Sequence, residues 1–513
     1  MTKANSRVIN ATRNTIIGYI TYGISLLANF VIRTFFIKYL SKEALGISGL
    51  FSNVISLFSV IELGFGTAMM YSYYKPLRDG DHSKLRGYEK FFSKIYKFVS
   101  LAIFIFSLIL LPFLNYIIKD ANQIGNLYFI YYLFVIEVIL SYLMYSKISI
   151  IVADQKEYIK NCYHIVFLII KVITQITILY FTKNYIIFLI SNSTIVVIEN
   201  IALSIKARKL YKLQNIEPEV VPHDEKSFVY NSVKGTAIYR LSNVIVDSTD
   251  NIIISSLFGL TIVGFLSNYQ LITNSLARLC GIIFSSLAPS VGNLNVTDDK
   301  PKKVQMFNVI NFISFFVYSI ISICLFILIN PFINLWVGQE YLLSQNVALA
   351  LSLNFFVTGL NQVLWIYRTT MGLHRYNQFR PILTVIFNIV LSIILGKILG
   401  VAGVIYATSI SKLTTTMIFD PIIIYKFGFN KNVKEYFVKN TIYILCFTLS
   451  IIGVWLIFRT VVINNLIKWI LSGIVLFGSL ALIYLLLFTK SNELKYIFGT
   501  AKNFYIRIIK KHR

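Results

Sequence analysis

The sequence predicts an all-α polytopic membrane protein, and three observations support that prediction. Of its 513 residues, 56% are hydrophobic and 14% are charged, whereas about a quarter of the residues of a soluble protein are charged. The mean hydropathy is +0.70. The apolar residues gather in runs long enough to cross a bilayer as helices, which takes about 20 residues. An ordinary soluble domain is therefore excluded.

Fourteen such runs are expected to form transmembrane helices. They fall near residues 15–37, 44–70, 98–118, 126–150, 161–181, 184–205, 233–257, 262–292, 306–331, 343–370, 377–399, 401–425, 438–458 and 467–488. We expect 1–210 to form a first lobe of six helices, 211–232 a cytoplasmic linker and 233–427 a second lobe of six. Residues 428–490 then hold two further helices, and 491–513 form a basic cytoplasmic tail.

The basic residues give an independent test of this topology, because Lys and Arg accumulate in cytoplasmic loops. Of the 48 lysines and arginines, 36 fall at the termini or in or beside alternate loops, seven in or beside the other loops and five in the interior of runs. Both termini are therefore expected on the cytoplasmic side of the cell membrane. The same distribution explains the net charge of +26 through topology and anionic lipid headgroups. No DNA-binding motif accompanies the charge, so nucleic acid is not an expected partner.

Two basic segments have open alternatives. Residues 81–97 are expected to be a charged loop, with an amphipathic surface helix as the alternative. The tail from Lys490 to Arg513 is expected to be a solvated end, with a partner-binding element as the alternative.

Catalytic and metal-binding motifs are not found in the sequence. The four cysteines are isolated from one another and the five histidines are scattered, so neither a disulfide framework nor a metal site is expected. No Walker A motif is present. We expect a protein that is not an enzyme, has no cofactor and draws on a gradient of Na⁺ or H⁺, on the membrane potential or on substrate consumption.

The chain also repeats itself weakly, which is typical of transporters built from two related halves. A shift of 218 residues places Gly46 on Gly264, and both glycines follow a short turn that is expected on the outer side. Because each half holds an even number of helices, the two halves are expected to be parallel repeats about an axis along the membrane normal.

One stretch carries a family resemblance. The sequence IELGFGTAMMYSYYKPL at 61–77, preceded by EALGISGLF at 43–51, resembles polysaccharide and O-antigen flippases of the multidrug/oligosaccharidyl-lipid/polysaccharide exporter (MOP) superfamily. The resemblance implies a V-shaped, pseudo-two-fold pair of lobes with a central cavity. It also implies that an undecaprenyl-pyrophosphate-linked oligosaccharide moves from the cytoplasmic to the outer leaflet by alternating access. A polysaccharide polymerase and glycosyltransferases of the same pathway are candidate partners.

Ten charged residues of the predicted spans are candidates for a polar cavity. A charge at mid-membrane costs about 2.5–3.5 kcal/mol, so ten of them facing lipid would cost roughly 25–35 kcal/mol. They are therefore expected to face protein, water or substrate. They are Arg33, Glu62, Glu137, Lys171, Glu199, Arg240, Asp247, Asp250, Arg278 and Lys412.

Cations are expected to bind the pyrophosphate, and arginine suits this role because its planar fork pairs with two phosphate oxygens. We expect Arg33, Arg240 and Arg278 to line the cavity, together with Asn29 and Asn268. The alternatives are ion pairs and snorkelling for the arginines, and helix–helix hydrogen bonds for the asparagines.

Acids on the same spans are candidates for ion coupling or gating. Asp247 and Asp250 are three residues apart, so a helix places them on one face, where two carboxylates repel. Pairing with Arg240 or Arg278 is the alternative. Glu62 precedes Gly64 and Gly66, which are expected to bend the helix; its alternative is helix pairing.

The remaining charges are expected to form structural pairs within lobes. Lys171 has Glu137 and Glu199 as candidate partners, and Lys412 is expected to pair with a carboxylate in the second lobe. These residues are not expected to take part in transport.

Three other classes of protein remain open. A multidrug exporter of the same superfamily would have the same lobes with a more apolar pocket. A glycosyltransferase or polymerase would need a large outer loop, and all the predicted outer loops are short. A scaffold or receptor would tolerate loss of the charges inside the spans.

Overall fold

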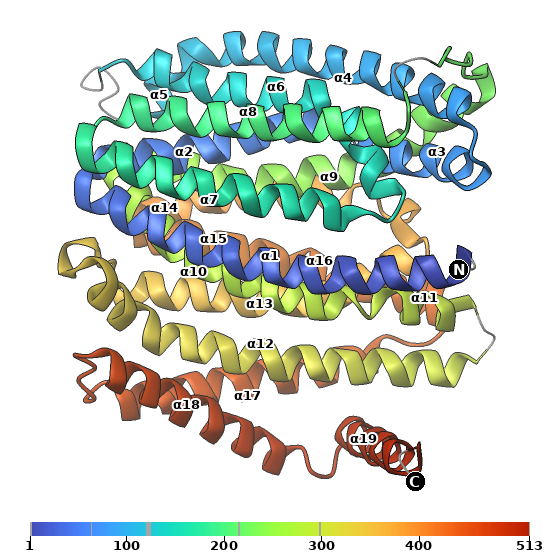
Figure 1. Cartoon of the computed structure of the whole chain (residues 1–513). Helices are drawn as coiled ribbons and strands as arrows, with labels where there is room; N and C mark the ends of the chain where they lie inside the picture. The colour runs from blue at the N-terminus through green and yellow to red at the C-terminus, as the bar shows by residue number, and fades with distance from the viewer. Residues whose placement is uncertain (1–2, 63, 119–124, 214–215, 297–298, 512–513) are drawn as a thin grey trace. The chain divides into compact units, whose positions relative to one another are not determined.

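A computed structural model describes residues 3–62, 64–118, 125–213, 216–296 and 299–511. Its regular elements are all helices, which confirms the predicted class of an all-α polytopic membrane protein. The chain divides into two compact units, residues 1–267 and 268–513. Within each unit most of the long helices run side by side (Figure 1).

The first unit begins and ends with a long helix. Its elements are α1 (Lys3–Tyr39), α2 (Lys42–Phe58), the 3-10 turn η1 (Ser59–Glu62), α3 (Phe65–Asp79), α4 (His82–Leu110), η2 (Leu111–Phe113), α5 (Leu114–Ile117), α6 (Leu127–Ala153), α7 (Glu157–Thr182), α8 (Tyr185–Leu210) and α9 (His223–Phe258). Helix α10 (Leu260–Ser285) crosses the division between the units.

The second unit holds the rest of the chain. Its elements are α11 (Ala288–Val296), α12 (Lys300–Val337), η4 (Gln339–Tyr341), α13 (Gln345–Thr370), η5 (Leu373–Arg375), α14 (Arg380–Leu399), α15 (Val401–Thr414), α16 (Thr416–Ile423), the π-helical η6 (Ile424–Phe429), α17 (Lys434–Phe458), α18 (Leu466–Leu487) and α19 (Asn492–Lys511).

Helices occupy all fourteen predicted runs, but eleven among the described residues are long and apolar enough to cross a membrane. The other three runs differ for physical reasons. The second is broken after α2, which has 17 residues. The seventh, α9, carries many polar residues. The twelfth is divided between α15 and α16.

The expected charged loop at 81–97 is wrong. Helix α4 begins at His82 and continues into the third apolar run without a break. Asp81 caps it by accepting a hydrogen bond from the N–H of Lys84 at 2.8 Å, which satisfies one of the free amides of the first turn. The buried Leu85, Tyr88 and Phe92 then pack this polar segment onto the core of the unit.

The predicted bend in the second run lies at Gly64. This residue has φ = +97°, a left-handed conformation that glycine adopts without strain. Gly64 has no side chain that could cap α3. The Glu62 carboxylate caps the helix instead, by accepting a hydrogen bond from the N–H of Gly66 at 2.7 Å. Tyr96 donates its hydroxyl to the same oxygen at 3.2 Å. A Cβ at position 66 would lie 2.6 Å from Oε1 of Glu62, so a larger residue there would displace the carboxylate that caps α3.

The two glycines matched by the internal repeat pack against each other. A Cβ on Gly46 would lie 2.1 Å from the carbonyl oxygen of Leu260, and one on Gly264 would lie 2.9 Å from the backbone nitrogen of Gly46. The start of α2 therefore touches the start of α10 backbone to backbone. Small residues permit this close approach in membrane proteins. Two serine hydroxyls, of Ser56 on α2 and Ser248 on α9, meet at 2.6 Å further along.

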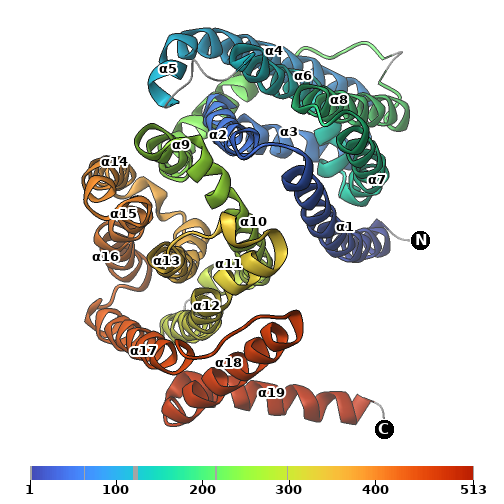
Figure 2. The ribbon, with the colours of Figure 1, turned by 90° about the vertical axis from the view of Figure 1, so that its left-hand side faces the viewer.

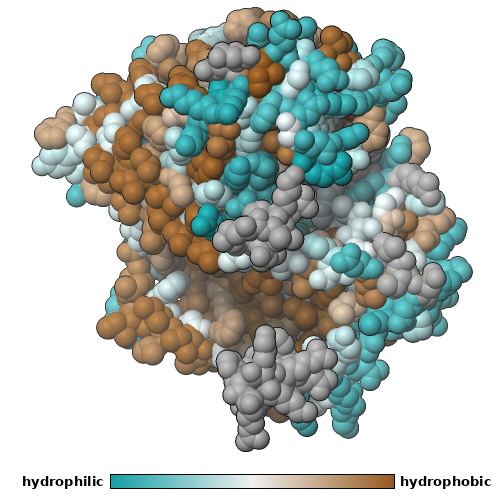
Figure 3. Space-filling model, turned by 45° about the vertical axis from the view of Figure 1, so that its right-hand side comes forward, coloured by the Kyte–Doolittle hydropathy of each residue, from teal (hydrophilic) through white to brown (hydrophobic). Residues whose placement is uncertain are grey.

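Hydrophilic and hydrophobic surfaces are separated along the helices of the first unit. In the upper part of Figure 3, hydrophobic side chains cover the left-hand side and hydrophilic ones gather at the right. The hydrophilic end holds α3, the start of α4 and the turn between α6 and α7 (Figure 1), the end that the basic residues predict to be cytoplasmic.

Adding one methyl group at the glycine contact should destabilise the protein. We expect Gly46→Ala to lower the free energy of unfolding by about 1–3 kcal/mol, the usual cost of overpacking, because its new Cβ meets backbone that cannot rotate away. Thermal unfolding in detergent measures the change.

Gly23→Ala is the matched control, since Gly23 lies within α1 and nothing approaches its missing Cβ within 4 Å. Alanine there should be neutral or stabilise by about 0.5–1 kcal/mol. Equal unfolding temperatures for the two variants would contradict the close contact.

Candidate functional site

Arg33 lies on α1 inside the candidate span Thr12–Tyr39 and is half-buried. Its Nη1 donates a hydrogen bond to the Ser267 hydroxyl at 3.2 Å, and that hydroxyl donates to the carbonyl of Gly264 at 2.7 Å. Among the described residues, no carboxylate lies within ion-pair distance of Arg33. A guanidinium has five N–H donors, so the group retains the capacity to bind an anion.

The other residues predicted to bind substrate lie on α1, α9 and α10. Asn29 is exposed on α1, one helical turn before Arg33 and on the same face. Arg278 is exposed on α10. The side chain of Arg240 lies outside those that the structure describes.

Asn268 on α10 is fully buried, and neither amide atom has a hydrogen-bond partner among the described residues. Buried amides without partners are uncommon. Water or a ligand is therefore the expected partner of this side chain.

The three acids predicted to serve in ion coupling or gating lie at the break in the second run or on α9, which packs against it. Glu62 caps α3, as described above. Asp250 is partly buried on α9, and α9 packs against α2, η1 and α3. The side chain of Asp247 lies outside the described set. An ion-coupling role for these acids stays a prediction.

The acids predicted to pair structurally have hydrogen-bond partners inside the first unit. Glu137 on α6 accepts from the Asn192 amide and from the Ser193 hydroxyl on α8, both at 2.8 Å. Glu199 on α8 contacts Nδ1 of His164 on α7 at 3.0 Å. No ion pair within 4 Å joins Lys171 to either acid among the described residues, so the predicted clamp stays a prediction.

Lys412 in the second unit donates to the Thr358 hydroxyl at 3.3 Å. This partner is neutral, whereas a carboxylate was expected. Its Nζ is held between α15 and α13, the helices that carry the two residues.

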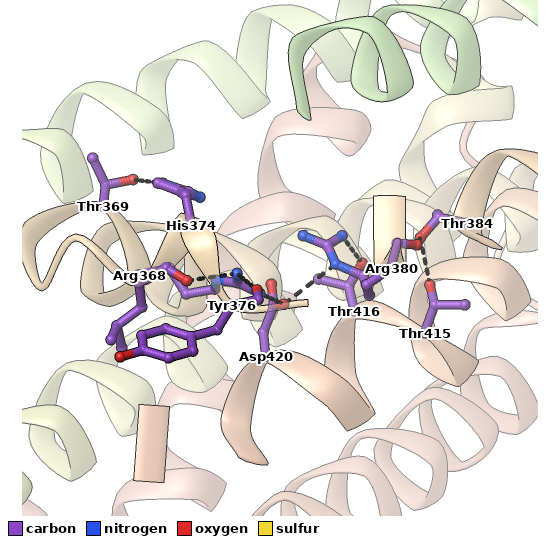
Figure 4. A network of polar contacts seen from close by, with 10 residues as sticks. Arg368, Thr369, His374, Tyr376, Arg380, Thr384, Thr415, Thr416 and Asp420 are labelled. Carbon is purple, nitrogen blue, oxygen red and sulfur yellow. Dashed lines mark hydrogen bonds and ion pairs between the residues drawn. The ribbon is translucent and has the colours of Figure 1, made fainter. Parts of the chain in front are cut away.

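A buried cluster of charges in the second unit was not predicted. Figure 4 shows Asp420 on α16 between two arginines, Arg368 at the end of α13 and Arg380 at the start of α14. Arg368 Nη1 pairs with Asp420 Oδ1, and Arg380 Nε lies 3.3 Å from the same oxygen. All three side chains are buried, Arg368 completely.

The cluster also holds the connection between α13 and α14. Arg368 Nη2 donates to the carbonyls of Leu373 at 3.0 Å and Tyr376 at 2.9 Å. Arg380 Nη1 donates to the Thr416 hydroxyl at 2.9 Å. Burial, with Arg368 and Arg380 nearby, lowers the pKa of His374 to about 4. His374 is therefore neutral near pH 7 and adds no third cation.

The sequence contained a signal for this cluster that was not used. Asp420 is a carboxylate inside the run 401–425 and needs a cation there. Arg368 and Arg380 lie near the ends of their runs, where basic residues are ordinary neighbours of cytoplasmic loops. The pairing joins residues 52 positions apart, which no local pattern indicates.

A cavity of about 1120 Å³ opens at the hydrophilic end of the first unit, among α1, α3, α4, α9 and the turn between α6 and α7. Its walls combine aromatic rings with charges of both signs: Tyr71, Tyr74, Lys75, Arg78, Tyr88, Asp154, Lys156, Asp224, Glu225 and Phe228. Glu225 accepts from Lys84 at 2.9 Å and from the hydroxyl of Tyr88. Although partial burial opposes it, these hydrogen bonds lower the pKa of Glu225.

Three of the cavity's aromatic rings are more than half exposed, those of Tyr71, Tyr74 and Phe228. The rings of Tyr71 and Phe228 lie 5.6 Å apart. Such a wall offers flat apolar faces beside hydrogen-bonding groups, the combination that binds small polar molecules with apolar faces.

Comparison with solved structures finds this fold in transporters of the MOP superfamily. The lipid II flippase MurJ, in an inward closed conformation, is 16% identical with a TM-score of 0.61, and the match covers 92% of this chain and 98% of that one. An inward-facing multidrug resistance MATE family transporter is 10% identical with a TM-score of 0.58, covering 78% and 94%.

A MATE transporter from Vibrio cholerae is 12% identical with a TM-score of 0.56, covering 84% of this chain and 99% of its own. No protein-family model matches the sequence, and no curated protein matches it. The chain therefore has the fold of MOP-superfamily transporters and is a multi-pass membrane protein.

Removing the carboxylate of the charge cluster should strongly destabilise the second unit. Asp420→Asn keeps the shape of the side chain but leaves two buried guanidinium groups without their anion. We expect a loss of about 3–5 kcal/mol in the free energy of unfolding, measured by thermal or denaturant unfolding in detergent.

Asp79→Asn serves as the control, because Asp79 pairs with Arg78 at an exposed position, where ion pairs contribute little. A comparable loss in both variants would show that the Asp420 cluster has no special structural role.

Proposed function

We propose that this protein is a flippase for lipid-linked oligosaccharides. It transfers an undecaprenyl-pyrophosphate-linked repeat unit from the cytoplasmic to the outer leaflet by alternating access, for assembly of a capsule, exopolysaccharide or O-antigen type of polymer. The observation that carries the proposal is Arg33, a cation within an apolar span whose hydrogen bond goes to a neutral serine hydroxyl.

The chemistry of the cargo explains why such a cation is useful. A lipid-linked oligosaccharide has an apolar tail that stays in the bilayer and a pyrophosphate and sugars that cannot cross hydrocarbon unaided. A guanidinium binds phosphate oxygens bidentately. The free energy of that interaction offsets part of the cost of taking the pyrophosphate out of water.

The fold and the cavity support the same proposal. The likeness to the lipid II flippase extends over 92% of this chain, against 78% and 84% for the two MATE transporters. A lipid-linked precursor with a diphosphate is also what the sequence resemblance implies. The cavity beside Tyr71 and Tyr74 supplies hydrogen-bonding groups and aromatic faces at the end that is predicted to be cytoplasmic, where the sugars start.

A multidrug exporter is the second candidate, and the likeness to the MATE family favours it. The two candidates differ in cargo. Proteoliposomes containing the protein separate them if they are offered both a fluorescent lipid-linked oligosaccharide and ethidium, with and without Na⁺ and H⁺ gradients. The flippase proposal expects transfer of the glycolipid and no export of the dye. Dye export without glycolipid transfer would establish the exporter instead.

The assays with and without Na⁺ and H⁺ gradients also test which ion, if either, is coupled to transport. We propose that Na⁺ or H⁺ coupling, where it occurs, uses Asp247, Asp250 or Glu62, the acids on the helices around the break in the second run. The polymerase and glycosyltransferases of the pathway are proposed partners, because they consume and supply the cargo.

Loss of the arginines should slow transfer more than it affects folding. Charge-assisted hydrogen bonds contribute about 1.5–3 kcal/mol, so we expect Arg33→Ala with Arg278→Ala to reduce the initial rate of glycolipid transfer at least tenfold. The rate is measured as the exposure of the labelled sugars to an external quencher.

Arg459→Ala is the matched control. Arg459 is exposed at the end of α17, outside the predicted substrate path, and this variant should transfer at the rate of the unaltered protein. Full activity in the double variant would refute the pyrophosphate contact.

A further inference from the structure

The last helix of the second unit, α19, runs across the others. Figure 2 shows α12 and α13 nearly end-on, whereas α19 is seen from its side; in Figure 1 α19 is the helix seen close to end-on. If α12 and α13 cross the bilayer, α19 lies close to the membrane plane.

The beginning of α19 is held at the predicted cytoplasmic end of the unit. Lys439 on α17 bridges Glu435 and Glu493 at 2.7 Å each, and Glu493 is in the first turn of α19. Leu494 is buried, and α19 packs against α12. The helix therefore has a fixed starting point and direction.

The short link between α18 and α19 limits how far the start of α19 can lie from the hydrocarbon. Helix α18 is a candidate span that ends at Leu487, and α19 begins at Asn492. The residues between them reach at most about 14–18 Å even when fully extended. The start of α19 therefore lies within about 14–18 Å of the end of the α18 span, which places it beside the membrane surface.

The sequence of α19 is amphipathic at helical spacing. Apolar residues recur at the i, i+3, i+4 and i+7 positions of one face: Leu494, Ile497, Phe498, Ala501, Phe504, Tyr505, Ile508 and Ile509. Within the described side chains of this face, Phe498 is 59% exposed. An exposed phenylalanine on a helix beside the membrane surface is suited to burial in the interface.

The charges of α19 have one sign after its first turn. Residues 494–511 contain Lys495, Lys502, Arg507, Lys510 and Lys511 and no acid; Lys495 and Lys502 are exposed. A basic amphipathic helix with this pattern binds in the interface of anionic membranes, through apolar burial together with attraction to negative headgroups.

We propose that α19 is a lipid-binding helix, which lies in the headgroup layer of the cytoplasmic leaflet and binds anionic phospholipids through its basic residues. The expected alternatives for this tail were a solvated end and a partner-binding element. The short link to α18, the crosswise direction and the charge favour a lipid surface. The inference is independent of which cargo the protein carries.

Hydrogen exchange of the full-length protein tests the proposal. The protein is placed in nanodiscs of phosphatidylcholine alone, or of phosphatidylcholine with about one-third phosphatidylglycerol. Each basic residue near an anionic surface shifts binding about fivefold. We therefore expect amide exchange over residues 495–511 to be at least tenfold slower with phosphatidylglycerol, and the difference to shrink in high salt.

Two multiple variants of α19 distinguish the effect of its positive charge from an effect on its folding. Lys502→Gln/Arg507→Gln/Lys510→Gln should lose the protection that phosphatidylglycerol confers, and Lys502→Arg/Lys510→Arg should keep it. Exchange in α12 and α13 serves as the folding control and should be equal in all variants.

Equal protection in the two lipids would overturn the proposal, because the helix would then be held by its apolar face or by protein contacts alone. Fast exchange in both lipids would also overturn it, and would leave the tail as a solvated segment or as the binding site of a protein partner.

Discussion

The structure depends on one constraint: polar groups placed among apolar spans must be satisfied by the protein, because hydrocarbon offers them no partner. The broken second run shows how this is done. Gly64 ends one helix and starts another, and the amide left free at Gly66 is taken up by Glu62, which also accepts from Tyr96. The interruption is thus stable without water and gives the run a fixed bend.

The same constraint explains the rest of the polar interior. Glu137 has Asn192 and Ser193, and Asp420 has two arginines. Arg33 differs from these, since its described hydrogen bond goes to a neutral hydroxyl. A cation placed in this way is suited to an anion that arrives and leaves. This difference between satisfied structural charges and a cation with remaining donors is the physical basis for proposing a phosphate-bearing cargo.

The sequence predicted the fold class well, because long apolar runs are a local signal that the bilayer imposes directly. Local signals also indicated the bend at Gly64 and the importance of Gly46 and Gly264. They did not reveal that these last two glycines touch. A helix at 82–97 was expected only as the alternative to a charged loop, because its buried Leu85, Tyr88 and Phe92 are interspersed with basic residues. The Asp420 cluster was missed because its pairing is tertiary.

A series of lipid headgroups tests whether cations within the spans recognise an anionic headgroup. One oligosaccharide would be attached to the same lipid through a diphosphate, a monophosphate or a neutral glycosidic link, and its initial transfer rate measured in proteoliposomes containing the protein. The transfer rate should fall at least tenfold from the diphosphate to the neutral lipid, with the monophosphate between them. Equal rates for all three lipids would contradict it.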